Sequence, residues 1–297
     1  MRYKISVSEV AFNIFSYLLL IILSISAVYP FLNSIALAFN QGNDSLRGGI
    51  YFWPRLATLE NFKAIFSNND ILNGTYVSVF KTVVGTLLHV SVTAACAFSL
   101  SKRYLPGNKL LTAYLLIPTL FGGGIVPYYI LLRSLHLTNS IWVYILPSLF
   151  SFFNILIIRT YFESLPAEIE EAAIIEGCNY FTILIRIIMP LSLPVIATVA
   201  LFTAVGQWND WFAGYFFVSR NELQPLSTIL VNFLKENDTS SIFDKLGVNS
   251  AHSITRTYTS ESLKMAVLVV VTMPILVTYP FLQKYFLKGV LIGSVKG

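Results

Sequence analysis

Charged side chains are scarce in this sequence, and their scarcity excludes an ordinary soluble domain. Only 12% of the 297 residues are Asp, Glu, Lys or Arg, whereas soluble domains carry about a quarter. Hydrophobic residues make up 55%, and the mean hydropathy is +0.68. The net charge of +5 comes without a basic patch interleaved with aromatics, so it bears on membrane topology and anionic lipid rather than on nucleic acid. We expect a multi-spanning membrane protein.

The sequence also lacks the motifs of a catalytic chain. It has no G-x-x-x-x-G-K-[ST] loop to hold phosphates, no H-E-x-x-H metal motif and no serine nucleophile elbow. His89, His136 and His252 are scattered, and Cys96 and Cys178 have neither metal nor disulfide spacing. The sequence therefore predicts no catalytic, cofactor or metal site in this chain. If ATP drives its work, ATP and Mg²⁺ bind to another polypeptide.

Six apolar runs are long enough to cross a bilayer, which requires about 20 residues. They cover residues 12–39, 77–100, 110–132, 140–162, 187–218 and 263–286. The first is too long for a signal-peptide core, so we expect an uncleaved span. The sequence thus predicts an all-α membrane protein with six transmembrane helices. The G-G-G-I-V-P stretch at 122–127 predicts a bend in the third run, as a packing kink or as part of a substrate path.

Basic residues near the membrane indicate how the chain is inserted. Six spans put both termini on one side, and the total number of Lys and Arg is equal on the two sides. The positive-inside rule, however, weights short segments close to the membrane. The N-terminal tail, residues 101–109 and the C-terminal tail are densely basic. We therefore expect both termini, and the loop around residue 171, to lie in the cytoplasm.

The most charged short segment lies between the fourth and fifth runs, with four glutamates within residues 168–176. Pro166 suits the first turn of a helix, with Ser164 or Leu165 as its cap. Gly177 can adopt the positive φ that ends a helix. The sequence predicts a short helix at about 164–179, outside the membrane and joined by a turn to a spanning helix.

The spacing in this segment resembles the EAA loop of bacterial ABC importer permeases. The family pattern is E-A-A, three residues, G, nine residues and I-x-L-P; this chain has E-A-A at 171–173, G at 177 and I-I-M-P at 187–190. The resemblance implies a type I ABC importer permease whose coupling helix docks into a groove on the ATPase subunit. Glu171, Ala172, Ala173 and Gly177 would be the ATPase-coupling residues. Without the resemblance, the segment would be a cytoplasmic connector with a charged face.

A second informative stretch, Q-W-N-D-W at 207–211, lies near the end of the fifth run. Trp208 is about 27 Å from Pro190 along a helix, which places it near the outer interface. A carboxylate in an apolar run marks a functional-site candidate, tryptophan rings stack on sugars, and amides bind hydroxyls. Trp208, Asn209, Asp210 and Trp211 are therefore candidate substrate-path residues. The alternative is an interfacial aromatic belt with Asp210 facing water.

Further resemblance points to sugar import. W-N-D at 208–210 is similar to a stretch common in sugar-importing permeases. The segments Q-K-Y-F-L-K-G at 283–289 and G-S-V-K-G at 293–297 resemble the end of the second permease subunit of carbohydrate importers, of which the maltose transporter is the best known. The resemblance implies an oligosaccharide importer in the bacterial inner membrane. Its partners would be a second, different permease subunit, two ATPase subunits and an extracytoplasmic sugar-binding protein.

The same resemblance suggests how the chain is divided, because it runs from about residue 76 to the end. Residues 1–75 would form the first transmembrane helix and an extracytoplasmic loop. Residues 76–297 would form the permease core, with five transmembrane helices, the coupling helix and a cytoplasmic C-terminal tail.

Three alternatives stay open at this point. A secondary transporter driven by an ion gradient shows inverted repeats and charges at mid-membrane depth; here no repeat is evident, and Asp210 is the charge that stands out in the spans. A membrane-embedded enzyme would need clustered His, Asp or Glu near the interface. An ABC permease for a solute other than sugar is the third.

Overall fold

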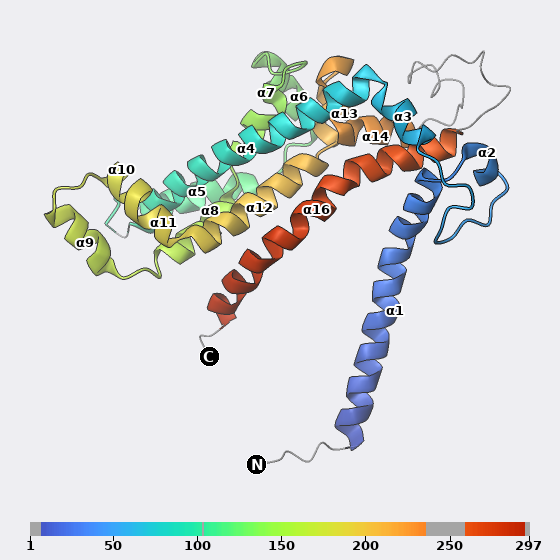
Figure 1. The fold of residues 1–297 in the computed structure, drawn as a ribbon. Helices are drawn as coiled ribbons and strands as arrows, with labels where there is room; N and C mark the ends of the chain where they lie inside the picture. The colour runs from blue at the N-terminus through green and yellow to red at the C-terminus, as the bar shows by residue number, and fades with distance from the viewer. Residues whose placement is uncertain (1–6, 103, 236–258, 295–297) are drawn as a thin grey trace. The chain divides into compact units, whose positions relative to one another are not determined.

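The computed structural model describes residues 7–102, 104–235 and 259–294, and helices provide nearly all the regular structure in these ranges (Figure 1). An isolated bridge between Asn40 and Ala57 is the one extended pairing that the described part of the chain contains. The predicted all-α fold is confirmed. The chain forms two compact units, the first made of Met1–Asn69 with Asn232–Thr272 and the second of Asp70–Val231 with Met273–Gly297.

The first unit contains three N-terminal helices and the start of the last helix. These are α1 (Val7–Ala38), α2 (Gly42–Ser45), α3 (Glu60–Phe66) and the beginning of α16 (Ser260–Ser294). The buried Asn61 connects them: its Nδ2 donates to the carbonyl of Ala38 at 2.7 Å, and its Oδ1 accepts from Ser262 Oγ at 3.0 Å. The Asn61 side chain thus donates a hydrogen bond to the carbonyl of Ala38, which is the last residue of α1 and would otherwise lack a helical partner.

The second unit contains most of the other helices. In chain order they are α4 (Asn69–Ser101), α5 (Asn108–Leu120), α6 (Ile125–Ser134), α7 (Trp142–Ile145), η1 (Leu146–Leu149), α8 (Phe152–Phe162), α9 (Ala167–Ile175), α10 (Tyr180–Ile183), the π-helix η2 (Leu184–Ile188), α11 (Met189–Leu191), α12 (Leu193–Asn209), α13 (Phe212–Phe217), η3 (Asn221–Leu223) and α14 (Leu226–Lys235). Helices α9 and α10 lie at one end of this unit, and α7 and α13 lie at the other (Figure 1).

Three described helices are long and apolar enough to cross a membrane: Ser8–Ala38, Asn69–Ser101 and Ser260–Thr278. Three further spans consist of bent pairs. The bend is 114° between α5 and α6, 48° between the α7–η1 segment and α8, and 87° between the α10–α11 segment and α12. Counting each pair as one span gives the six that the sequence predicts.

The bend predicted at 122–127 is confirmed. Helix α5 ends at Leu120, and α6 begins at Ile125 after Gly124, whose φ is +81°. This backbone conformation is one that glycine adopts at little cost.

The predicted fifth span, residues 187–218, differs from the structure at both ends. Residues 187–191 belong to the segment bent away from α12, because Ser192, with φ −100° and ψ 13°, interrupts the helix before Pro194. Pro194 then occupies the first turn of α12, where its missing N–H needs no partner. At the other end, Asp210 is extended with ψ 101°, so α13 is a separate helix.

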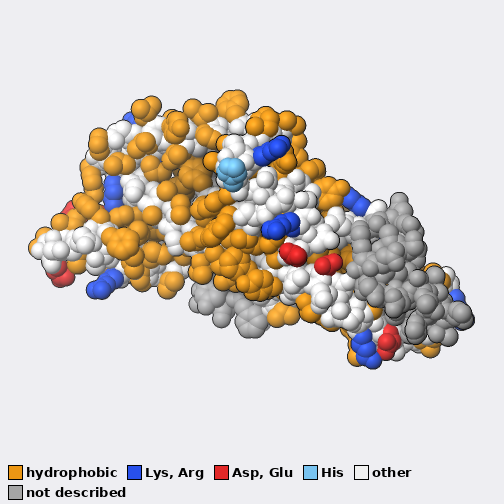
Figure 2. Space-filling view, turned by 90° about the horizontal axis from the view of Figure 1, so that it is seen from above, with side chains coloured by type: hydrophobic (Ala, Val, Ile, Leu, Met, Phe, Trp, Pro, Cys, Tyr) orange, Lys and Arg blue, Asp and Glu red, His pale blue; other side chains and the backbone are white. Residues whose placement is uncertain are grey.

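Two hydrophobic clusters form the core of the second unit. One combines the later part of α4 with α8, α9, α10, η2 and the first turns of α12; the other combines Val77 of α4 with side chains of α6, α7 and α13. Hydrophobic side chains also dominate the surface in Figure 2, where charged groups are few. Such a surface is suited to lipid or to a partner membrane protein.

Candidate functional site

Helix α9 begins differently from the prediction. Pro166, with ψ 130°, is its N-cap residue, and neither Ser164 nor Leu165 caps it. Ser164 instead belongs to the end of α8, because its Oγ donates to the carbonyl of Tyr161 at 2.6 Å. The two glutamates in the first turn of α9 lie where the positive end of the helix dipole favours a carboxylate.

The other end of α9 is closed by the glycine that the sequence singled out. Gly177 has φ +84°, which confirms that it takes a positive φ. Its N–H donates to the carbonyl of Ile174 at 2.9 Å, and the N–H of Cys178 donates to the carbonyl of Ala173 at 3.0 Å. This pair of hydrogen bonds is a Schellman motif, which satisfies two helix-end carbonyls and turns the chain toward α10.

The residues of the E-A-A motif point to opposite faces of α9. Ala173 is 4% exposed and packs into the cluster that joins α4, α8 and α12. Glu171 and Ala172 are exposed, and with the exposed Glu168 and Ile175 they form a stripe at helical spacing, which we call the outer stripe. Ile175 is 85% exposed, and it was not among the predicted coupling residues. Its spacing of four from Glu171, on the same helical face as Glu168, is the signal that could have identified it.

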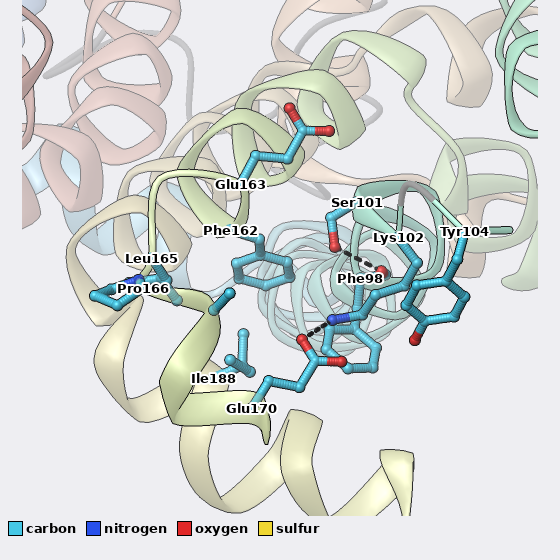
Figure 3. A pocket seen from close by; sticks show the side chains of 11 residues that line it. Phe98, Ser101, Lys102, Tyr104, Phe162, Glu163, Leu165, Pro166, Glu170 and Ile188 are labelled. Carbon is cyan, nitrogen blue, oxygen red and sulfur yellow. Dashed lines mark hydrogen bonds and ion pairs between the residues drawn. The ribbon is translucent and has the colours of Figure 1, made fainter. Parts of the chain in front are cut away.

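The inner face of α9 is attached to the end of α4 by an ion pair (Figure 3). Lys102 donates from Nζ to Glu170 Oε2, and the side chains are 13% and 20% exposed. The same ammonium group lies 3.9 Å from the centre of the Phe98 ring. Glu170 therefore faces the protein while its neighbour Glu171 faces outward. A cavity of about 400 Å³ lies beside this contact.

Tyr104 adds a second connection from the same loop. A hydrogen bond with Tyr180, followed by desolvation and the nearby Glu170 carboxylate, raises the pKa of Tyr104 to about 12. The phenol therefore keeps its proton at neutral pH and remains a hydrogen-bonding partner for the start of α10. Asn108 holds the loop in shape, because its Nδ2 donates to the carbonyls of Leu100 and Lys102, both at 2.9 Å.

We expect Gly177→Ala to loosen the end of α9 and Gly177→Asn to be milder. A β-carbon at positive φ costs about 1–2 kcal/mol, whereas asparagine tolerates this region better. Space is not the problem, since an added Cβ would meet nothing within 4 Å. In a Cys96→Ser background, alkylation of the half-buried Cys178 should accelerate about fivefold or more in the alanine variant and less in the asparagine variant. Equal rates in all three proteins would contradict the role of the backbone conformation.

At the opposite end of the unit, the predicted substrate-path residues are divided by the structure. Trp208 is buried, whereas Asn209 and Trp211 are exposed, so they do not form one surface. Asp210 is half-buried at the junction of α12 and α13, where its Oδ1 accepts from the N–H of Ala213 at 3.2 Å. Asp210 thus accepts a hydrogen bond from the first turn of α13, whose N-cap residue is Trp211.

Asp210 is paired with a lysine that the sequence reasoning overlooked. Lys81, in the second span, is fully buried; its Nζ donates to the Asp210 carbonyl at 2.7 Å and lies 3.9 Å from Asp210 Oδ2. The ammonium also lies 4.8 Å from the centre of the Tyr144 ring. The view that Asp210 alone stands out in the spans is therefore wrong. The rule that singled out Asp210, a charge within an apolar run, applies equally to Lys81.

A hollow of about 250 Å³ lies beside Asp210. Its lining residues are His89, Tyr144, Ser148, Asn154, Thr203, Gly206, Gln207 and Asp210. They come from α4, α7, η1, α8 and α12, except for Asp210, which directly follows α12. Of the four predicted substrate-path residues, Asp210 is the one that lines it.

Metal chemistry has no support in the described ranges, where no group of three or more His, Cys, Asp or Glu could hold an ion. The two sites instead offer a protein-facing helix at one end and a hollow among spanning helices farther along. This combination fits a transport subunit that is moved by a partner.

Comparison with known proteins identifies the family. Residues 77–292 match the family described as binding-protein-dependent transport system inner membrane component. The chain belongs to this family and is a multi-pass membrane component of a binding-protein-dependent transport system. The expectation of an ABC importer permease, based on the E-A-A motif, is thereby confirmed.

Two relatives from Bacillus subtilis (strain 168) extend over almost the whole chain. The protein LplC is 39% identical over 91% of this chain and 90% of its own length. The polygalacturonan/rhamnogalacturonan transport system permease protein YtcP is 34% identical over 96% of this chain and 98% of its own length. A solved chain of a bacterial ABC transporter that imports the acidic polysaccharide alginate superposes with a TM-score of 0.87, at 26% identity, over 95% of this chain and 98% of that chain. These similarities bear out the resemblance to permeases of the carbohydrate-uptake type.

Proposed function

We propose that this chain is one of two different permease subunits of an ATP-driven sugar importer, and that α9 is the helix through which a separate ATPase acts on it. The outer stripe is the observation that carries the coupling role. An isoleucine that is 85% exposed lies on a helix whose other face is already packed and ion-paired. A large apolar side chain exposed in this way favours contact with a partner protein.

Two observations support sugar as the transported solute. YtcP is named for polygalacturonan and rhamnogalacturonan transport, and the similar solved chain belongs to an alginate importer. Both names describe saccharide polymers. We infer that this chain transports an oligosaccharide delivered by an extracytoplasmic binding protein. ATP and Mg²⁺ would bind to two ATPase subunits, since the chain has no P-loop.

Copurification tests this proposal and separates it from the alternatives. The tagged chain, expressed together with candidate permease and ATPase partners, should bring down one copy of another permease and two ATPase subunits for each copy of itself. The complex in proteoliposomes should take up oligosaccharide only with internal ATP and external binding protein. Uptake driven by a proton or sodium gradient without any ATPase would instead establish a secondary transporter.

The proposed orientation places both termini and α9 in the cytoplasm. We expect single cysteines in the 101–109 loop, in a background without Cys96 and Cys178, to resist a membrane-impermeant thiol reagent applied to intact cells. Cysteines in the 219–262 loop should react with it. Permeabilised cells provide the control, because both positions should then react. Labelling of the 101–109 loop from outside would reverse the topology and place α9 out of reach of an ATPase. Three segments used in this prediction lie outside the described residues. They are residues 236–258 of the second loop, Arg2 and Lys4 at the N-terminus, and residues 295–297 of the predicted tail.

A further inference from the structure

We propose that the loop between α2 and α3 is an interfacial anchor, whose aromatic tip lies at the boundary between lipid headgroups and acyl chains at the end of the first span. The tip consists of Tyr51, Phe52 and Trp53, all of them exposed, and Trp53 is 82% exposed. Three consecutive exposed aromatic side chains mark a surface that contacts a membrane or another protein. The inference concerns α1 and its loop alone, so it does not depend on the transported solute.

Burial along α1 locates the end of the membrane. Glu9 is the last charged residue of this helix, and none of residues 10–32 is buried within the chain. From Asn33 onward the helix packs against the rest of its unit, and Ala36 is buried. A bilayer core needs about 20 apolar residues, so a core that begins directly after Glu9 ends near Tyr29. The boundary of the bilayer core therefore lies where the packing of α1 against its own chain begins.

The loop runs back along α1 to this boundary (Figure 1). The Asn33 side chain donates from Nδ2 to the carbonyls of Ile50 and Tyr51, at 2.7 and 3.2 Å. The Phe52 ring meets the Tyr29 ring edge to face, with 5.5 Å between the ring centres. The aromatic tip is therefore level with Tyr29 and Asn33, at the height where the apolar core ends.

Hydrogen bonds at the base of the loop hold the tip in this position. The N–H of Gln41 donates to the carbonyl of Leu56 at 2.9 Å, which brings the two ends of the loop together. Arg55 crosses the base: its Nε donates to Asp44 Oδ2 at 3.0 Å, and its Nη2 donates to the carbonyl of Gly48 at 2.6 Å. The segment is thus a compact Ω-loop, whose backbone presents the aromatic side chains outward.

The chemistry of the tip favours lipid as the surface that it contacts. Tryptophan and tyrosine are enriched at membrane–water interfaces, because their rings are apolar and each carries one polar hydrogen. Asn33 satisfies two loop carbonyls that would otherwise face a region with little water. Height and composition thus agree on the interface. Coverage by a second permease subunit or by a binding protein is an outcome that the experiment distinguishes.

Nitroxide labels at two positions of equal exposure test the depth of the tip. Phe52 is 57% exposed and Leu59 is 58% exposed. Leu59 is the matched control, because the N–H of Thr58 donates to the carbonyl of Phe39, which lies beyond the end of α1. Phe52→Cys and Leu59→Cys are introduced separately into the complete transporter, without the native cysteines, and the labelled complexes are placed in nanodiscs.

The measurement compares collisions of each nitroxide with oxygen, which concentrates among acyl chains, and with a water-soluble nickel chelate. We expect the oxygen-to-chelate ratio to be about fivefold higher or more at position 52 than at position 59, because a group about 5–10 Å deep meets little chelate. The same ratio at both positions, with free access of the chelate, would show that the tip stays in water and would overturn the anchor.

A second measurement leaves the tip unaltered in the reference protein. Lipids brominated in the upper part of the acyl chains quench nearby tryptophans, and the difference between the wild type and Trp53→Phe isolates the emission of Trp53. We expect these lipids to lower this difference signal about twofold or more, because the indole of an interfacial anchor lies among them. If Phe52→Cys does not assemble, this signal decides, and an unquenched Trp53 would overturn the anchor.

The remaining outcome assigns the tip to a protein partner. Low collision of the label at position 52 with both oxygen and the chelate would show that protein covers the tip, and it would also overturn the lipid anchor. The covering protein is the binding protein if the effect needs its addition, and the second permease subunit if it does not. Sugar uptake is not measured, so failure of the proposed sugar import would leave this test intact.

Discussion

Ile175→Asp should abolish uptake by disrupting the proposed contact between α9 and an ATPase, whereas Ile174→Asp should preserve most of the uptake. Burial of an isoleucine side chain stabilises a contact by about 1.5–3 kcal/mol, and an aspartate at the same place would also have to lose its water. The ATPase should therefore bind at least tenfold more weakly. Ile174 is 45% exposed and lies off the outer stripe, so it is a matched control with the same substitution one residue away.

The measurement is the affinity of the purified ATPase for permease in detergent or nanodiscs, followed by uptake in proteoliposomes. Glu171→Lys in the same stripe should produce a comparable loss, because a carboxylate at such an interface can bind a partner cation. If Ile175→Asp and Glu171→Lys both bind the ATPase and transport as the wild type does, α9 is a connector. If Ile174→Asp and Ile175→Asp are equally defective, loss of helix packing rather than loss of the stripe is the cause.

Reversing either charge of the Lys102–Glu170 pair should uncouple ATP hydrolysis from transport. This pair and the packing of Ala173 attach α9 to the spanning helices, so under the proposed coupling they would carry a movement of α9 to the spans. A hydrogen bond to a charged group at a mostly buried site contributes about 1.5–3 kcal/mol. In Lys102→Glu or Glu170→Lys, attraction becomes repulsion, and uptake should fall at least tenfold while ATP hydrolysis continues.

The double variant Lys102→Glu with Glu170→Lys makes the test specific. It restores opposite charges, so uptake should recover by several-fold over either single variant. Recovery should be incomplete, because a glutamate near the Phe98 ring loses the cation–π contact. Glu163→Lys is the control: it breaks an ion pair with Arg159 within α8, and uptake should stay within twofold. A double variant no better than the single ones would show that the pair does not transmit force.

The α9 end of the protein was predictable from the chain because its signals are local. These signals depend only on residues that are close in sequence. They are the glycine that ends a short helix, the acidic residues in its first turn, and the motif spacing from Glu171 to Pro190. The cap was not predicted correctly, because Ser164 can serve either the end of α8 or the start of α9. Its bond to Tyr161 decides between them only once α8 has its observed length.

Contacts between segments that are distant in sequence were not predicted at either end of the second unit. Lys81 and Asp210 are 129 positions apart, and Lys102 and Glu170 are 68 apart. Nothing in the spacing of either pair relates one residue to the other. The tryptophans were grouped with Asp210 by adjacency, but the end of α12 at Asn209 turns them onto different surfaces.

The sequence by itself determined the class of this protein: apolar runs set the spans, glycine and proline set the breaks, and one spaced motif set the family. These features follow from bilayer thickness and backbone geometry, which act along the chain. Only the tertiary structure decided which face of α9 is available to a partner. It also decided that Lys81 lies beside Asp210 and that Gln207 and Thr203 line one hollow. Those facts depend on how α4, α8 and α12 pack side by side, and packing contacts depend on proximity in space, which sequence separation does not record.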